Sequence, residues 1–246
     1  MIVGKPQQNE DVPALLRTAG LTKRYGRRTA LDRASFFAVP GEILGLIGPN
    51  GSGKTTLLET VAGLLPSDAG EIFWKGQVLP AGCRRDVMFY LPDGIRPYQD
   101  QPVARVLSFF AAVYRRSSEQ VASIVSALGL APILQKRVSA LSKGYNRRLL
   151  LALALVTPHP LLLMDEPLDG FDPRQTREIM HVLHCLATAG RTLVLAIHQL
   201  ADAERMCDRF VLLADGRVRG FGRLDELRAQ TRLLSGSLED VFLALT

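Results

Sequence analysis

A glycine-rich loop between an apolar strand and a helix constrains this chain more than any other feature. The apolar run from Ile43 to Ile47 precedes the loop, and a helix-like stretch begins at Thr56. The loop reads Gly48-Pro49-Asn50-Gly51-Ser52-Gly53-Lys54-Thr55. Its glycines allow successive backbone N–H groups to point inward, and the following helix adds the positive end of its dipole. This match to the pattern GxxxxGK[ST] predicts a loop that binds phosphate groups.

Two side chains of the loop carry its chemistry. Lys54 can reach the β- and γ-phosphates of a nucleotide, and the Thr55 hydroxyl can hold Mg²⁺. The expected cofactor-binding residues of this segment are Gly48, Pro49, Asn50, Gly51, Ser52, Gly53, Lys54, Thr55 and Thr56.

Length and composition indicate a globular protein. A chain of 246 residues fits one large domain or two closely packed subdomains, and its residues are 47% hydrophobic and 22% charged. The longest apolar run, Leu149 to Val156, is well short of the ~20 residues that span a bilayer. The start of the chain lacks the apolar region of a signal peptide, so we expect a cytosolic protein.

The basic charge and the cysteines are less informative. A net charge of +6 is compatible with a nucleic-acid partner, an anionic membrane surface or a solvated face. The arginines come mostly as scattered pairs, among them Arg147-Arg148, without the interleaved aromatic residues of a base-stacking surface. This favours the solvated face, with membrane proximity second. The three cysteines show no metal-ligand spacing and are expected to be free thiols.

Short strands are expected on both sides of the loop. The segments Leu21–Tyr25 and Ser35–Val39 read as strands, and the residues before Val12 read as a loose tail. Tyr25 precedes a glycine turn, where its ring could stack on an adenine or simply pack against the strand. Two further strands are predicted at Gly70–Gly76 and Val87–Leu91.

The pattern becomes helical between Pro97 and Ser139, where apolar residues recur at helical spacing, so a helical insertion is expected. Phe109 lies just off the apolar face of this region, and periodicity alone leaves it equally open to exposure or burial. Ser142 is placed to cap the next helix, Tyr145–Val156.

Two carboxylates follow a strand that should be buried on both faces. The wholly apolar run Leu161–Met164 is typical of a central parallel strand, and it leads into Asp165 and Glu166. Parallel sheets bind ligands at the carboxyl ends of their strands, so a functional pair is favoured over a solvated turn. Thr192–Ile197 is a second buried strand, which ends at His198 beside the expected nucleotide.

The last third alternates helices and strands. A helix is expected at Pro173–Ala189, and its His181 and His184 are spaced like a metal pair but lie on its polar face, which favours solvated side chains. A hairpin between Phe210 and Gly220 and helical segments from Leu224 to Thr246 follow.

In the order of its motifs the chain resembles the ATP-binding subunit of an ABC transporter. These motifs are the phosphate loop, Leu141-Ser142-Lys143-Gly144, the strand end at Asp165-Glu166, Gly170-Phe171-Asp172, and His198. The details are most similar to subunits of ABC-2 type exporters, which often have a lysine in the signature, as at Lys143, and a tail like Leu238-Glu239-Asp240-Val241-Phe242.

The resemblance implies roles for individual residues. Asp165 would position Mg²⁺ together with Thr55, and Glu166 would orient or deprotonate the attacking water. His198 would contact the γ-phosphate of ATP, and Tyr25 would contact the adenine. Catalysis would therefore rest on Glu166, His198 and Lys54.

The resemblance also implies dimerisation. Ser142 and Gly144, at a helix N-terminus, would bind the γ-phosphate of ATP held by a second copy, so that two chains close around two nucleotides. Asp172 would lie along that interface. The second chain would be an identical subunit or a paralogue.

The sequence departs from the family pattern at four positions. Lys143 and Tyr145 replace a glycine and a glutamine of the usual signature, Phe171 replaces a common leucine, and Asp93 replaces a glutamine that senses Mg²⁺ and the transport domain. Because the loop lysine Lys54, the Mg²⁺ carboxylate Asp165 and the water-activating Glu166 remain, we expect a competent ATPase. Asp93 is the expected link between metal and partner, and Gln99 and Gln101 are the competing candidates.

We therefore expect an α/β P-loop NTPase core with a mostly parallel sheet, an antiparallel β subdomain and an α-helical insertion. The core and β subdomain would comprise residues 12–92 and 157–223, the helical subdomain 93–156, and the C-terminal helical tail 224–246.

The expected function is ATP hydrolysis that powers a separate membrane-spanning permease, as part of an exporter. The expected cofactors are ATP and Mg²⁺, and no nucleic-acid partner is expected. The subunit would sit on the inner face of the cell membrane through that permease. The alternative is a soluble ABC ATPase that acts on nucleic acid or ribosomes, but such proteins commonly resemble two fused ATPase domains or carry long coiled coils, and neither pattern is found here.

Overall fold

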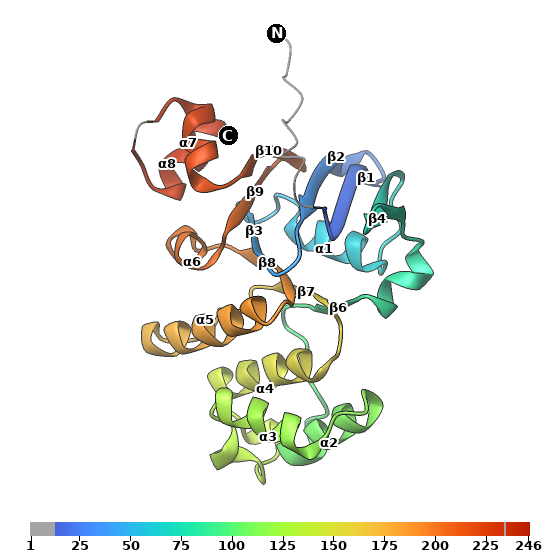
Figure 1. Cartoon of the computed structure of the whole chain (residues 1–246), viewed down its shortest axis with the longest axis vertical. Coiled ribbons are helices and arrows are strands. Elements are labelled where there is room, and N and C mark those ends of the chain that lie inside the picture. The colour runs from blue at the N-terminus through green and yellow to red at the C-terminus, as the bar shows by residue number, and fades with distance from the viewer. Residues whose placement is uncertain (1–12, 234) are drawn as a thin grey trace.

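The computed structural model describes residues 13–233 and 235–246 (Figure 1). The tail expected before Val12 lies outside the described residues. Within the described chain, no helix has both the length and the apolar character that crossing a membrane requires.

A six-stranded sheet forms the centre of the fold, with strand order β10-β9-β3-β8-β7-β6. Its strands are β3 (Ile43–Ile47), β6 (Met88–Leu91), β7 (Leu161–Asp165), β8 (Thr192–Ile197), β9 (Arg209–Ala214) and β10 (Arg217–Gly222). The pairs β9-β3, β3-β8, β8-β7 and β7-β6 are parallel, and β10 pairs with β9 in the antiparallel direction. The mostly parallel sheet expected from the sequence is therefore confirmed.

A second, four-stranded sheet is antiparallel and has the order β2-β1-β4-β5. Its strands are β1 (Leu16–Tyr25), β2 (Arg28–Ala38), β4 (Ala69–Trp74) and β5 (Gln77–Val78). This sheet is the antiparallel part that the sequence predicts.

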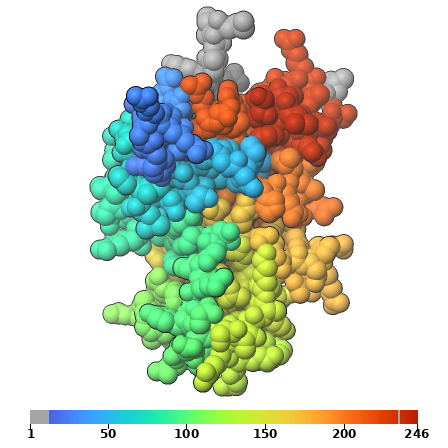
Figure 2. All heavy atoms as spheres, turned by 180° about the vertical axis from the view of Figure 1, so that it is seen from behind, coloured from blue at the N-terminus to red at the C-terminus, as the bar shows by residue number. Residues whose placement is uncertain are grey.

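The helices cover the central sheet and extend from it. They are α1 (Lys54–Ala62), α2 (Val103–Val113), α3 (Ser118–Ala127), α4 (Lys143–Val156), α5 (Pro173–Thr188), α6 (Leu200–Met206), α7 (Leu224–Thr231) and α8 (Leu238–Leu245). Figure 1 shows α2, α3 and α4 together at one end of the molecule and α7 and α8 at the other. Seen from behind, the green and yellow-green residues of that helical end form the lower part of the surface (Figure 2).

The alternation of side chains along each strand gives the central sheet two covered faces. Leu44 and Leu46 of β3 pack in one apolar cluster with α1 and the antiparallel sheet, whereas Ile43 and Ile47 pack in another with α4, α5 and α6. Every residue of β3, β7 and β8 is buried. Strands covered on both faces lose the polar alternation of a surface strand, which is why they read as unbroken apolar runs.

Helix starts follow the capping residues in the sequence. The Ser142 hydroxyl accepts a hydrogen bond from the Tyr145 N–H at 3.3 Å, as predicted. At the start of α5, the Asp172 carboxylate accepts from the N–H groups of Arg174 and Gln175, both at 2.9 Å. Each cap satisfies N–H groups that have no partner inside the helix.

Element bounds differ from expectation mainly at the N-terminus. β1 begins at Leu16 rather than Leu21, and β2 begins at Arg28 rather than Ser35. Irregular register between Thr18 and Leu21, with a left-handed Gly20 (φ 63°), breaks the alternation on which the prediction of β1 depended. In the helical region, α2 begins only at Val103, after an irregular stretch.

Candidate functional site

The phosphate loop connects β3 to α1 as a tight turn. Gly51 and Gly53 have φ angles of 81° and 108°, which side-chain-bearing residues rarely adopt. A Cβ atom at Gly48 would overlap the Leu213 carbonyl and lie 2.6 Å from the Ser52 hydroxyl. The loop can therefore wrap this closely only with glycine at these positions.

Two polar groups inside the loop fit a phosphate ligand. The Lys54 ammonium donates to the carbonyls of Gly48 at 2.7 Å and Pro49 at 3.3 Å, so it is folded back over its own loop. Burial lowers the pKa of Lys54, while Glu166 and Asp165 act to raise it. The Ser52 hydroxyl is buried and has no hydrogen-bond partner among the described residues. A buried hydroxyl without a partner is costly, and an anion in the loop would supply one.

Thr55 and Asp165 come together across the end of the sheet. The Thr55 hydroxyl donates to Asp165 Oδ2 at 2.6 Å, although 110 positions separate the two residues. Burial raises the pKa of Asp165, and the negative charge of Asp93 raises it further. The hydrogen bond from Thr55 and the positive charges of Lys54 and Arg147 act to lower it. Oxygen ligands of this kind are the ones that Mg²⁺ prefers, so the pair fits a magnesium ion.

Glu166 and His198 are joined at the ends of neighbouring strands. His198 Nδ1 lies 2.6 Å from Glu166 Oε2, and the His198 backbone N–H donates to the same oxygen at 3.3 Å. Glu166 has a φ angle of 49°, a left-handed conformation that costs about 1 kcal/mol or more for a residue with a side chain. Its N–H donates to the Ala196 carbonyl of β8 at 3.0 Å, which holds this conformation. The geometry fixes the carboxylate at the carboxyl edge of the sheet.

The first turn of α4 lies against the loop that follows Glu166. The Lys143 ammonium is 2.9 Å from Asp169 Oδ2, and its aliphatic part covers Gly170, where a Cβ atom would meet it at 2.8 Å. Gly144 lies close to Phe171 and Gln175. Across the described chain, Ser142 and Gly144 form no hydrogen bond with the phosphate loop. The structure therefore groups Lys54, Thr55, Asp165, Glu166 and His198, and leaves the signature turn outside this group.

Three comparisons with known proteins agree on the family of this chain. A family model described as ABC transporter matches residues 31–169, more than half of the chain. The chain belongs to the ABC transporter family. It is an ATP-binding subunit of that family, whose members hydrolyse ATP.

Curated relatives support this assignment. The chain is 36% identical to the Nod factor export ATP-binding protein I of Rhizobium etli over 84% of its own length and 67% of that protein. It is 31% identical to the ABC-type transporter ATP-binding protein EcsA of Bacillus subtilis over 95% of its length and 97% of that protein. The chain spans from 60% to 67% of the length of three Nod factor export ATP-binding proteins to which it is similar.

A solved ATP-binding subunit of an ABC transporter has the same fold. It superposes with a TM-score of 0.86 at 30% identity, covering 94% of this chain and 99% of the solved one. A nucleotide-free ATP-binding cassette superposes with a TM-score of 0.79 at 23% identity, which shows the shared fold alone.

Tyr25 lies at the tip of the antiparallel sheet of this ABC subunit. Its side chain is 49% exposed, and the Lys23 ammonium lies 5.5 Å from the ring centroid. The exposure rules out a core position, and the expected contact of this ring with adenine stays a prediction.

Asp93 is held by a residue that the sequence interpretation missed. Its carboxylate lies 2.8 Å from the guanidinium of Arg147, whose side chain is only 6% exposed. Arg147 was expected on a solvated face because it belongs to a surface-like arginine pair. That expectation was wrong for Arg147, because the first turns of α4 pack against two loops. The sequence around Arg147 gives no sign of this, because its acidic partner lies 54 positions away.

The two histidines of α5 are exposed, as expected, and His181 lies 3.7 Å from the Cys185 sulfur. No group of three or more potential metal-ligating residues occurs within 13–233 and 235–246. The cysteines form no disulfide with one another.

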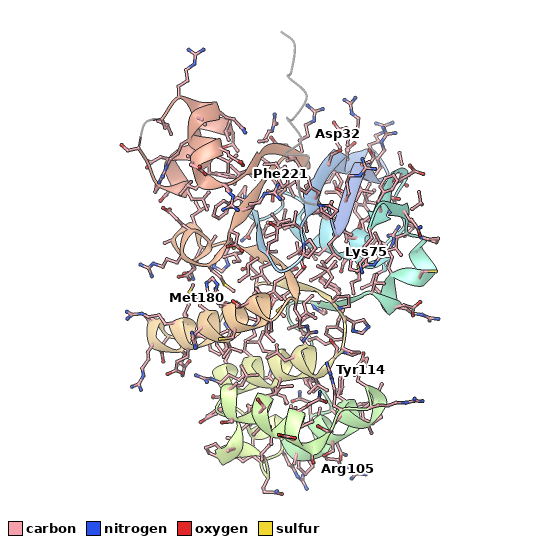
Figure 3. All side chains as sticks on the ribbon, in the orientation of Figure 1. Asp32, Lys75, Arg105, Tyr114, Met180 and Phe221 are labelled. Carbon is pink, nitrogen blue, oxygen red and sulfur yellow. The ribbon has the colours of Figure 1, made fainter. Side chains whose placement is uncertain are left out.

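The ABC subunit also carries an apolar groove of about 820 Å³ between β6, the loop after it, α2 and α4. Phe109 lines it and is 59% exposed, which decides between the exposure and the burial that periodicity had left equally open. The loop residues Ile95 and Tyr98 also line the groove and are 45% and 76% exposed. Arg105 of the same groove lies at the helical end of the molecule, far from Phe221 of β10 (Figure 3).

Proposed function

We propose that this ABC ATPase closes as a dimer around two molecules of Mg-ATP and thereby drives a separate membrane-spanning permease that exports its cargo. The proposal rests on one observation, that the structure places the sequence motifs in two separate groups. One edge of the sheet holds the hydrogen-bonded pairs Thr55–Asp165 and Glu166–His198 beside Lys54, which bonds to its own loop, while the Ser142–Gly144 turn forms no hydrogen bond with that loop.

The residues at the sheet edge would act together on one nucleotide. The loop N–H groups and Lys54 neutralise the β- and γ-phosphates, and Thr55 and Asp165 hold Mg²⁺, which supplies charge neutralisation when it is bound. Glu166 accepts a proton from the attacking water, and His198 both orients that carboxylate and contacts the γ-phosphate. Tyr25 stacks on the adenine.

The signature turn would complete the site of a second copy. Ser142 and Gly144 begin α4, where unpaired N–H groups and the helix dipole favour an anion. Since neither residue bonds to its own phosphate loop, a second chain can present this turn to the γ-phosphate. Asp172, at the start of α5, would lie beside that interface.

The groove would receive the permease. Its lining is mainly apolar, with Phe109, Ile95 and Tyr98 exposed, as expected of a surface that a helix of another protein covers. The Nod factor export relatives support export rather than import. The signature turn and most of the groove lining lie within residues 93–156, which we propose as the helical subdomain between the core segments 12–92 and 157–223, with 224–246 as a tail. The subunit would then lie on the inner face of the cell membrane.

Light scattering on Glu166→Gln tests the dimer. This variant keeps the phosphate loop but loses the group that activates water, so Mg-ATP should convert it from monomer to a stable dimer. The double variant Glu166→Gln with Lys54→Ala should remain monomeric, because it cannot hold the triphosphate. If the single variant were a monomer both with and without Mg-ATP, the result would count against the proposed dimer.

Affinity purification from solubilised membranes tests the partner. A hydrophobic, multi-span protein should co-purify with the subunit at a fixed stoichiometry. Recovery of nucleic acid or ribosomes in its place would favour the soluble ATPase alternative.

A further inference from the structure

Arg147 is a buried cation that the proposed reaction does not use. It lies in the second turn of α4, and only 6% of its side chain is exposed. A buried guanidinium is costly unless its N–H groups are bonded, so its partners show what holds it in place.

Its two partners belong to different loops. The guanidinium is 2.8 Å from Asp93 Oδ1, and its Nε donates to the Asp169 carbonyl at 3.3 Å. Asp93 is the second residue of the loop after β6, and residues 95–101 of this loop form one wall of the groove. Asp169 lies in the loop after β7, three positions beyond Glu166. Because a guanidinium is planar and rigid, a shift of one partner changes the geometry at the other.

The contacts continue from Asp169 to the catalytic residue. The Asp169 N–H donates to the Glu166 carbonyl at 3.1 Å, and the Asp169 carboxylate is fixed by Lys143 at 2.9 Å. Consecutive hydrogen bonds therefore join Asp93, in the loop that forms the groove wall, to the backbone of Glu166 through Arg147 and Asp169.

We propose that Arg147 is a positioning residue that couples occupation of the groove to the placement of Glu166. A partner that moves the loop after β6 shifts Asp93, and the guanidinium carries this displacement to Asp169 and so to the turn that begins at Glu166. This route differs from one through Mg²⁺, because it needs no nucleotide. The inference rests on the proposed function only in naming the permease as the partner in the groove.

Hydrogen exchange of the nucleotide-free subunit tests the route without any partner. The variants are Arg147→Met, Asp93→Asn, their combination, and Arg148→Met as the matched control. Arg148 is 12% exposed and neighbours Arg147, but its guanidinium binds Leu128 and Glu178 rather than Asp93 or Asp169. It also lies 5.8 Å from the centroid of the Phe171 ring, just beyond residues 166–170. Asp93 is 55% exposed, so water can solvate its carboxylate when Arg147 is replaced, and melting curves will confirm that each variant is folded.

Arg147→Met should speed exchange in residues 166–170 about fivefold, the effect of losing one hydrogen bond. Asp93→Asn should speed exchange in the same segment, although Asp93 does not touch it, and the combination should add nothing to Arg147→Met. Arg148→Met should leave this segment unchanged. The proposal would be overturned if Asp93→Asn left the exchange rate at residues 166–170 unchanged. It would also be overturned if the effects of Asp93→Asn and Arg147→Met on that rate were additive.

A second measurement uses the reconstituted complex. Arg147→Lys keeps the positive charge but lacks the planar guanidinium that can bond to two partners at once. The variant subunit should still bind the permease, while the stimulation of its ATPase kcat by the permease falls about tenfold and the KM for ATP is unchanged. Undiminished stimulation would contradict the inference. If the parent subunit binds no permease at all, the proposed function fails, while the exchange measurements still decide the role of Arg147.

Discussion

The nucleotide site and the groove lie on the same subunit but are built in opposite ways. At the site, the two carboxylates at the strand end are already paired with other side chains, Asp165 with Thr55 and Glu166 with His198. In the groove, large apolar side chains such as Phe109 and Tyr98 remain uncovered.

The difference follows from the ligand that each region would receive. A site for a charged ligand must be preorganised, because buried polar groups without partners are costly and a loosely held carboxylate cannot direct a proton. A docking surface needs only shape and apolar area, which the partner covers on binding. Substitutions in the two regions should therefore separate catalysis from assembly.

The largest effect is expected for Glu166→Gln. Loss of the carboxylate should lower the ATPase rate by about 10²- to 10⁴-fold, because no base then accepts the proton of the attacking water. ATP binding and assembly with the permease should persist. Steady-state kinetics and nucleotide titration measure both; a rate within threefold of the parent would place the base elsewhere.

Lys54→Ala should weaken ATP binding by about 10- to 100-fold, the contribution of charged hydrogen bonds to the triphosphate. Because the Lys54 ammonium bonds only to the carbonyls of its own loop in the described structure, the melting temperature should change little. Calorimetric titration with ATP gives the affinity. Affinity equal to that of the parent would remove the phosphate loop from the site.

Phe109→Glu should weaken assembly with the permease by about thirtyfold or more, as expected of a central apolar contact. The isolated subunit should keep its melting temperature within about 2 °C, since Phe109 is exposed. Val113→Glu is the matched control, because Val113 is 56% exposed on the same helix but does not line the groove. Equal loss with both variants would show a general effect of charge on α2.

The boundary between the two regions runs along the loop after β6. Asp93→Ala should spare ATP binding but reduce the stimulation of ATPase by cargo about tenfold, and Asp93→Asn should be milder because it keeps an oxygen. Gln99→Ala serves as the comparison, since Gln99 lines the groove and Asp93 binds Arg147. Uncoupling by Gln99→Ala with normal coupling in Asp93→Ala would assign the link to Gln99.

The smallest effect is expected outside both regions. His181→Ala and His184→Ala alter exposed side chains of α5 and should change the free energy of unfolding by no more than about 0.5 kcal/mol. ATPase rates should stay at the parent value with and without added Zn²⁺. A zinc-dependent change in either rate or stability would show that these histidines bind metal.

Much of the site follows from local sequence. The phosphate loop needs glycines at fixed spacing, and the carboxylates at Asp165 and Glu166 follow a strand whose burial is evident from its apolar run. Parallel neighbours end at the same edge of a sheet, so the meeting of Glu166 with His198 could also be expected. The start of the antiparallel strand β1 was harder to predict, because a left-handed glycine interrupts the alternation of side chains along the strand.

The sequence by itself therefore determined the fold class, the phosphate loop and the order of the catalytic groups, because each depends on a short pattern of backbone and side-chain chemistry. Only the tertiary structure decided that Phe109 faces outward, that Glu166 adopts a left-handed conformation, and that Arg147 is buried between two loops. These features depend on contacts between residues far apart in the chain. No local pattern records which loop will lie against the first turns of α4, and so the partner of a buried charge appears only when the chain is folded.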